Sequence, residues 1–325
     1  MNEHADAIKA YIDDLLNRVI ESTLAHGGKE ILDSVILTGS LGRNEPSIEV
    51  DDQGNITLLS DVEIAFVHSG KTEKLFHLID AVCGEFEEDL NIFPVTVSRV
   101  KYAANFNLSF SSPKYKTLFT FDLFNGSRTI WGTDYLLGRK VSIAECDVFE
   151  AKRLVANRIG ELIYLSSHDK KELLQMQWKG KVMLAIASAY LLLDQRYVSS
   201  YHGQRDRILE SKAEVDNIIG DGFTDMYCKT FDFLRESGDP YSIQDEDLRR
   251  YVKNVGLLFE KKNIKRSRVN SLSRKAKYVV KYLKTGCHYG ITGFENAILD
   301  SLIHDFADND DKVIIDAETW KKVLY

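Results

Sequence analysis

Two acidic side chains at alternate positions of one predicted strand are the residues of this chain best suited to chemistry. The segment Ser60–Val67 (SDVEIAFV) alternates polar and apolar residues, which predicts a half-buried strand. Because residues two apart on a strand point to the same face, we expect Asp61 and Glu63 to project side by side. Two carboxylates this close repel each other unless a cation neutralises them. Hard divalent ions such as Mg²⁺ or Mn²⁺ bind carboxylate oxygens and accept substrate phosphates, so the pair predicts a metal site.

A glycine and a serine follow the preceding predicted strand, Ser34–Thr38, and we expect them to open a short helix. Gly39 lets the backbone approach a phosphate closely, and Ser40 adds a hydroxyl donor. Nearby, Arg43 could neutralise a phosphate or pair with Glu45. A Gly-Ser pair after a strand is usually only a turn, but its position before the acidic strand favours phosphate binding.

A third carboxylate, Asp122, lies in Leu118–Phe124 (LFTFDLF), which we interpret as a strand. We expect this strand to form a hairpin with Arg128–Trp131. If it lies beside the acidic strand, Asp122 converges with the other two carboxylates. Two metal ions about 4 Å apart could then activate the attacking oxygen and stabilise the leaving phosphate. Asp122 alone could equally be an ordinary exposed strand residue.

Taken in order, the motifs TGS, SDVE, FDLF and RTIWG resemble the polymerase-β-like nucleotidyltransferase superfamily over residues 30–132. The resemblance implies that Asp61 and Glu63 hold both metal ions. It implies that Asp122 holds the ion that activates the acceptor hydroxyl. Gly39 and Ser40 would then contact the β- and γ-phosphates of a nucleoside triphosphate.

This chain departs from the family pattern at two places. Its second carboxylate is Glu63, where Asp is commoner, and its gap between Ser40 and Asp61 is longer than in minimal members. The gap contains the turn-rich segment Glu49–Ile56 (EVDDQGNI), which we interpret as the tip of an inserted hairpin.

The rest of the chain predicts two domains of different kinds. Up to about residue 140, predicted helices (5–26 and 71–90) alternate with predicted strands (34–38, 60–67 and 93–100). From Cys146 onward, segments of helical period follow at 148–168, 171–194, 204–218, 222–237, 244–262, 272–284 and 292–306, with a short strand at 312–315. We therefore predict an α+β fold with a mixed-sheet nucleotidyltransferase catalytic domain over 1–140. An all-helical nucleotide- or acceptor-binding domain follows over 141–325, with the active site in the cleft between them.

One stretch of the helical half, Gln177–Arg207, resembles the element that closes over the nucleotide in polymerase-β-like enzymes. Its candidate nucleotide-binding residues are Lys179, Lys181, Tyr197, Ser200 and Tyr201. A lysine could contact the triphosphate as a point charge, and a tyrosine could stack on the base. Alternatively, the lysines are solvated and the tyrosines pack in the core.

Composition restricts the partners. A net charge of −7 gives no overall attraction to nucleic acid or to an anionic membrane. The basic segment 261–284 could bind a nucleic acid or form a solvated helix face. The four cysteines show no CxxC spacing, and the longest apolar run, 182–193, is too short to span a bilayer. The N-terminus predicts an amphipathic helix and no signal peptide, so we expect a soluble cytoplasmic protein.

These observations predict a Mg²⁺-dependent nucleotidyltransferase that moves a nucleoside monophosphate from ATP or another triphosphate to a hydroxyl acceptor, releasing pyrophosphate. We favour a small molecule or a nucleotide as the acceptor over a long nucleic acid. One alternative is a non-catalytic, antitoxin-like regulatory protein that keeps the fold. Another is an anion-binding scaffold that uses the basic segment.

Overall fold

The computed structural model describes residues 5–51, 53–68, 72–86, 92–98, 117–168, 172–235 and 241–264, and positions 303, 306 and 307. The chain divides into two compact units. The first contains residues 1–145 and 235–237, and the second contains residues 146–234 and 238–325. Each unit is described by itself.

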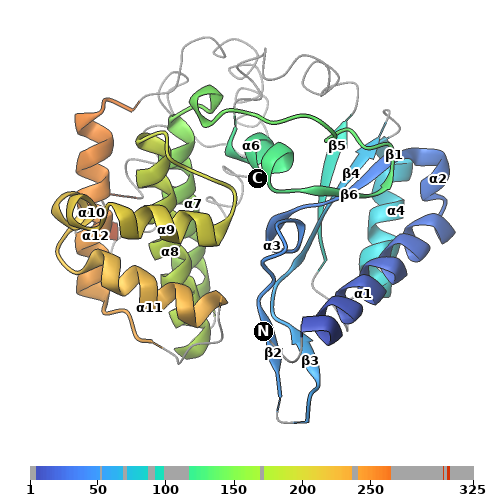
Figure 1. Ribbon diagram of the computed structural model, residues 1–325, viewed down its shortest axis with the longest axis horizontal. Helices are drawn as coiled ribbons and strands as arrows, with labels where there is room; N and C mark the ends of the chain where they lie inside the picture. Colours follow the sequence, from blue (N-terminus) through green and yellow to red (C-terminus); the bar gives the residue numbers. More distant parts are fainter. Residues whose placement is uncertain are drawn as a thin grey trace. The chain divides into compact units, whose positions relative to one another are not determined.

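The first unit is built on a four-stranded mixed sheet with the strand order β5-β4-β1-β6 (Figure 1). Its strands are β1 (Leu32–Leu37), β4 (Val62–His68), β5 (Ile92–Ser98) and β6 (Arg128–Gly132). β1 pairs antiparallel with both β4 and β6, whereas β4 pairs parallel with β5. The two central strands are buried almost throughout, which explains their nearly continuous apolar sequences.

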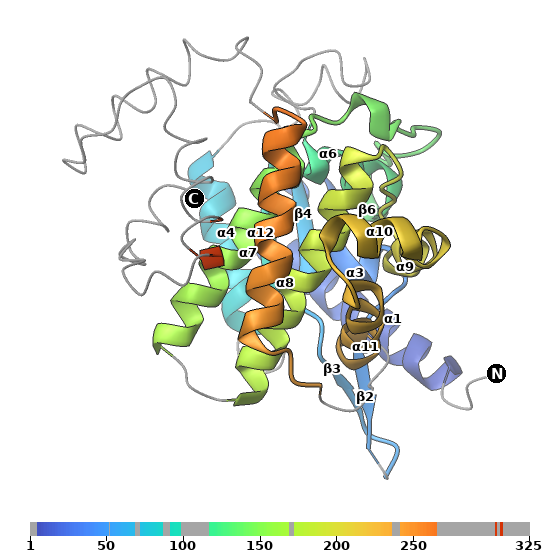
Figure 2. The same ribbon diagram turned by 90° about the vertical axis from the view of Figure 1, so that its left-hand side faces the viewer.

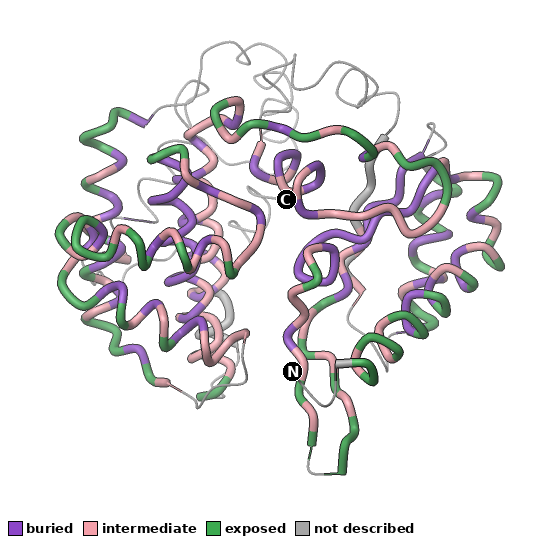
Figure 3. Tube along the Cα trace, in the orientation of Figure 1, coloured by how far each residue is buried: buried purple, intermediate pink, exposed green. Residues whose placement is uncertain are grey.

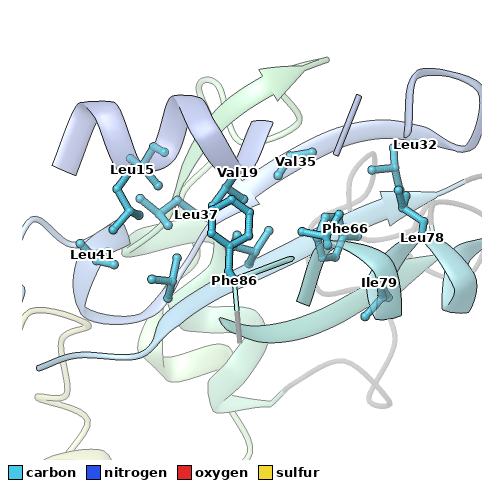
Figure 4. Packing of buried hydrophobic residues seen from close by; sticks show 14 of the residues in the cluster. Leu15, Val19, Leu32, Val35, Leu37, Leu41, Phe66, Leu78, Ile79 and Phe86 are labelled. Carbon is cyan, nitrogen blue, oxygen red and sulfur yellow. The ribbon is translucent and has the colours of Figure 1, made fainter. Parts of the chain in front are cut away.

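Helices α1 (Ala5–Ala25) and α4 (Thr72–Glu85) cover one face of this sheet, and the short α2 (Gly28–Ile31) connects α1 to β1 (Figure 1). The apolar positions of α1 recur at helical spacing and those of β4 at period two, so both present a continuous apolar face. Figure 4 shows the core that these faces form, with Leu15 and Val19 of α1 near Leu37 and Phe86. At the solvent edge of this layer, the Ser22 hydroxyl donates a hydrogen bond to Glu85.

The predicted hairpin is confirmed. Strands β2 (Ile48–Val50) and β3 (Ile56–Leu58) form a separate two-stranded antiparallel sheet. Its turn is closed by Asp51, whose Oδ1 accepts hydrogen bonds from the backbone N–H groups of Gln53, at 2.9 Å, and Asn55, at 2.8 Å. The described residues of the turn are exposed (Figure 3).

The predicted strand over Leu118–Phe124 is wrong, because this segment is the helix α6 (Leu118–Asn125). Thr117 caps the helix, and its side chain accepts a hydrogen bond from the Thr120 N–H. The predicted hairpin with residues 128–131 is therefore also wrong, since β6 pairs with β1 instead. A short apolar run does not distinguish a strand from a buried helix by its period, and here tertiary burial on several sides favours the helix.

The second unit is helical in its described part. Its helices are α7 (Phe149–His168), α8 (Glu172–Leu193), α9 (Tyr201–Glu210), α10 (Lys212–Ile219), α11 (Phe223–Arg235) and α12 (Asp245–Lys261). Every residue from Val182 to Leu193 is buried, and α8 packs against α7, α9 and α12 (Figure 2). An all-round apolar helix of this kind has to lie in the centre of its unit.

The predicted helices over 148–168, 171–194, 222–237 and 244–262 are confirmed within one to two residues at their described ends. The predicted helix over 204–218 is instead two helices that meet at Ser211. The predicted elements at 272–284 and 312–315, most of 292–306, and the basic segment beyond residue 264 lie outside the described residues. Among the described helices, none combines the length and apolarity needed to cross a bilayer.

Candidate metal and phosphate site

The Gly-Ser turn follows β1 directly. Gly39 and Ser40 begin the four-residue helix α3 (Gly39–Gly42), all of which is buried, so the predicted short helix is confirmed. Gly39 has φ +65°, a left-handed conformation that glycine adopts more readily than other residues. At the other end, a Cβ on Gly42 would lie 2.6 Å from the Leu37 carbonyl oxygen and 3.0 Å from that of Gly126. The turn is therefore packed tightly between β1 and the end of α6.

Glu63 lies directly against this turn. The Thr38 N–H donates a hydrogen bond of 2.9 Å to the Glu63 carbonyl oxygen, which extends the β1–β4 pairing by one residue. A Cβ on Gly39 would lie 2.6 Å from both Cδ and Oε1 of Glu63. The carboxylate thus occupies the space that any side chain at Gly39 would need. The turn and the acidic strand, which are far apart in sequence, meet at this point.

Asp61 is exposed immediately before β4, and Glu63 is partly exposed. Val62 between them is fully buried, so the two carboxylates flank a residue that points into the core. Ser60, which precedes Asp61, accepts a hydrogen bond of 2.7 Å from the Ser47 N–H through its hydroxyl. This bond closes the base of the β2–β3 hairpin and brings the inserted chain back to the site.

Arg43 forms an ion pair with Glu45, with 3.6 Å between Nε and Oε2. Both side chains are largely buried, with exposed fractions of 8% and 12%. The Glu45 N–H also donates a hydrogen bond of 2.8 Å to the Ser40 carbonyl oxygen. Of the two roles considered for Arg43, the structure contains the pairing with Glu45.

The predicted placement of Asp122 on a strand is wrong, whereas the predicted metal-binding role of Asp61, Glu63 and Asp122 stays a prediction. Within the described residues, which include Asp61, Glu63 and Asp122, no group of three or more His, Cys, Asp or Glu side chains could hold a metal ion. Asp122 is on α6 and not on a strand beside β4. β4 lies between β1 and β5 in the sheet. On the β5 side, the sequence from Leu90 to Phe121 contains no Asp or Glu.

In the second unit, both candidate lysines have partners within that unit. Lys179 forms an ion pair of 2.6 Å with Asp245 at the start of α12, and it donates a hydrogen bond of 3.3 Å to the Ile243 carbonyl oxygen. The Lys181 ammonium lies 4.0 Å from the ring centroid of Trp178. These contacts tie α8 to α12 and to its own preceding turn.

The remaining candidates lie around the start of α9. Tyr197 is buried, with an exposed fraction of 6%, so its ring packs inside the unit. Ser200 is the N-cap of α9, where its hydroxyl accepts a hydrogen bond of 3.0 Å from the Gly203 N–H. Tyr201 is the first residue of α9 and is partly exposed. The predicted nucleotide-binding role of these residues stays a prediction.

Sequence reasoning missed Thr38 and Ser60 as parts of the site. The Thr38 hydroxyl lies 3.4 Å from Oε2 of Glu63, and Ser60 holds the hairpin base next to Asp61. The available signal was a polar residue at the end of a buried strand in each case. That signal is weak, because the sequence does not show the partners of the two hydroxyls, which are Glu63 for Thr38 and the Ser47 N–H for Ser60.

A scan against models of known protein families finds no match, and a comparison with curated proteins finds no relative by sequence.

Proposed function

We propose that the first unit binds a nucleoside triphosphate together with Mg²⁺ or Mn²⁺ and transfers its nucleoside monophosphate to a hydroxyl acceptor, releasing pyrophosphate. The observation that carries this proposal is the contact between the Gly39 turn and the Glu63 carboxylate, with Asp61 exposed beside it. A backbone turn without a side chain next to two carboxylates suits a phosphate whose charge a cation neutralises.

The donor chemistry of the residues present fits one hard divalent ion. Asp61 and Glu63 offer carboxylate oxygens, and Mg²⁺ commonly takes one or two protein carboxylates while phosphates and water complete its shell. When bound, such an ion neutralises phosphate charge and polarises the phosphorus towards attack. The two-ion arrangement expected from the sequence depends on Asp122, so we propose one ion, bound by Asp61 and Glu63.

The chain's own groups supply positioning. The missing side chain of Gly39 leaves room for the Glu63 carboxylate, and Ser40 would offer its hydroxyl to a phosphate bound beside that carboxylate. Glu63 lies between Thr38 and Gly39, and these two neighbours restrict the directions that its oxygens can take. Transfer of a phosphoryl-type group depends mainly on such positioning and on charge neutralisation.

The acceptor we propose is a small molecule or a nucleotide. The acidic net charge of −7 disfavours long nucleic acids, which bind through many cationic contacts. We keep Lys179, Lys181, Tyr197, Ser200 and Tyr201 of the second unit as predicted nucleotide contacts. For both lysines, binding a triphosphate would require exchanging the partners described above.

A second candidate function is triphosphate binding without transfer, as in a regulatory or antitoxin-like protein of the same fold. The position of Asp122 on α6 favours this candidate. In the polymerase-β-like enzymes that the sequence resembles, the third carboxylate holds the ion that activates the acceptor hydroxyl. β5 contains no Asp or Glu that could replace it here. The two candidates share the binding step and differ only in the release of pyrophosphate.

One experiment separates these possibilities. Binding of each of the four nucleoside triphosphates is measured by calorimetry with Mg²⁺, Mn²⁺ or EDTA, and pyrophosphate release is followed in the same samples with candidate small-molecule acceptors. The variants Asp61→Asn and Glu63→Gln should lose the metal-dependent part of the affinity. Asp122→Asn, which keeps the shape and removes the charge, should retain it.

Each outcome has a defined meaning. Metal-dependent binding with pyrophosphate release supports the transferase, and binding without release under any acceptor supports the regulatory candidate. If Asp61→Asn and Glu63→Gln bind as tightly as the wild type, the proposed site is wrong. If Asp122→Asn also loses metal-dependent binding, Asp122 is a metal ligand in the working protein.

A further inference from the structure

We infer that Thr38 is a positioning residue, which uses its hydroxyl to hold the Glu63 carboxylate in the direction needed for the metal ion. This inference deepens the proposed function and rests on it. Thr38 is the last residue before the Gly-Ser turn, and its exposed fraction is 4%. Its side chain is therefore shielded from water and depends on partners within the protein.

The contacts of the Thr38 hydroxyl lead to a single residue. Oγ1 lies 3.4 Å from Oε2 of Glu63 and 3.5 Å from its carbonyl oxygen. A hydroxyl has one proton to donate, and the carbonyl oxygen already accepts the Thr38 N–H at 2.9 Å. A donor prefers a charged carboxylate to a neutral carbonyl that is already bonded. The hydroxyl proton is thus directed to Oε2.

Gly39 restricts the same carboxylate from a second side. The space next to its Cα is filled by Cδ and Oε1 of Glu63, since a Cβ there would lie 2.6 Å from both atoms. One oxygen of the carboxylate therefore meets the Thr38 hydroxyl and the other meets the turn. A free glutamate side chain loses roughly 1.5 to 2 kcal/mol of rotamer freedom on being fixed. A carboxylate held in advance no longer loses that freedom when the ion binds.

Hydrogen bonds to a metal-binding carboxylate typically change metal affinity about 10- to 100-fold when they are removed. The bond here is long, so we expect the lower end of that range. The backbone hydrogen bond from Thr38 to Glu63 survives any substitution except proline, which limits damage to the strand pairing. The hydroxyl can therefore be removed with little effect on the fold.

The test compares Thr38→Val, which keeps the shape and removes the hydroxyl, with Thr38→Ser, which keeps the hydroxyl. The probe is a non-hydrolysable ATP analogue, titrated with Mn²⁺ and separately in EDTA. We expect Thr38→Val to weaken the Mn²⁺-dependent affinity about ten-fold and Thr38→Ser to stay close to the wild type. Affinity in EDTA should be equal in all three proteins, whereas general damage to the fold would lower it as well.

A second measurement is independent of nucleotide binding. Thr38→Val is combined with Glu63→Met, which has a similar length and no carboxylate, and thermal unfolding is recorded for both single variants and the pair. If the hydroxyl bonds the carboxylate, Thr38→Val lowers Tm more in the wild type than in Glu63→Met.

The outcomes separate the inference from the proposed function. Wild-type binding with unchanged Mn²⁺-dependent affinity in Thr38→Val overturns the inference and leaves the proposed function standing. If the wild type binds no triphosphate, the proposed function fails, and the role inferred for Thr38 in metal binding fails with it. The Tm comparison then decides whether the contact between Thr38 and Glu63 exists, and equal Tm losses in both backgrounds exclude it.

Discussion

The substitution Gly39→Ala tests the contact on which the proposed site depends. Gly39 has φ +65°, so any other L-residue at this position bears a cost of roughly 1 to 2 kcal/mol from the left-handed conformation. The alanine Cβ would also lie 2.6 Å from Cδ and 3.1 Å from Cβ of Glu63. The carboxylate can rotate away, but the Glu63 Cβ is fixed to β4, so the backbone of the turn or the strand has to shift.

Gly138→Ala is the matched control, because Gly138 has φ +70° and a Cβ there would meet no atom within 4 Å. Both variants bear the conformational cost, and for a unit of this size we expect each to lose about 3 to 6 °C of Tm from it. Only Gly39→Ala displaces a carboxylate. We therefore expect Gly39→Ala alone to lose metal-dependent triphosphate affinity, by about ten-fold or more.

The assay is calorimetric titration of a non-hydrolysable ATP analogue with Mn²⁺ and with EDTA, alongside thermal unfolding of both variants. The reasoning is refuted if Gly39→Ala folds, loses the same Tm as Gly138→Ala and retains the full Mn²⁺-dependent affinity. In that case the proximity of Gly39 to Glu63 has no part in metal binding. A loss of affinity in EDTA as well would show that the turn itself, and not the carboxylate, was damaged.

Three further predictions concern other parts of the chain. If Lys179 serves mainly to pair with Asp245, Lys179→Met and Asp245→Asn should lower Tm by similar amounts. A loss of triphosphate affinity in Lys179→Met alone would instead support the predicted contact between this lysine and the nucleotide. Gln204→Leu should destabilise the second unit by about 2 to 3 kcal/mol in denaturant unfolding, because it leaves the buried Ser188 hydroxyl and the Val198 carbonyl oxygen without their partner. A smaller loss of unfolding free energy than in Ser188→Ala would contradict this. Burial raises the pKa of Cys83, so its thiol should stay protonated at neutral pH and react slowly with Ellman's reagent. The reaction should become faster as the pH rises. Reaction at pH 7 at the rate of a free thiol would show that Cys83 is not shielded.

Elements with a long and regular pattern could be predicted from the sequence. α8 and α12 are long helices with regular burial patterns, and β4 is a run of buried, mostly apolar residues that Glu63 interrupts. Their local pattern agrees with their tertiary surroundings, so pattern alone identifies them. The hairpin at β2–β3 was predictable for a different reason, since its turn residues are specific to turns.

α6 shows where this reasoning fails. Its eight residues are mostly apolar, and they are buried on more than one side of the helix, so no polar face marks a helical period. The capping signal, Thr117 followed by Thr120, is local but also common in strands. Because the sequence pattern assigns this segment to a strand, Asp122 is expected beside β4, whereas it lies on the helix α6. An error in one short element thus changes the expected position of the third candidate metal ligand.

The contacts of Glu63 could not be predicted from the sequence for a different reason. Its partners Thr38 and Gly39 are adjacent to it only because β1 pairs antiparallel with β4, with Leu37 opposite Ile64. A shift of this register by one residue would turn Glu63 into the core and Ile64 towards the turn. The apolar faces of both strands fix the register, so the packing of the core with α1 and α4 determines where the carboxylate lies.

Because the β1–β4 pairing positions Glu63, the long insertion between the Gly39 turn and β4 does not separate the turn from the carboxylate. The Ser47 N–H bonds the Ser60 hydroxyl at 2.7 Å, and the Ser47 carbonyl oxygen accepts the Leu59 N–H at 2.9 Å. The inserted chain therefore leaves and returns at nearly the same place. Loop length costs little once its ends are fixed by other contacts. Gly39 and Glu63 are held together by the β1–β4 pairing and not by the chain that connects them.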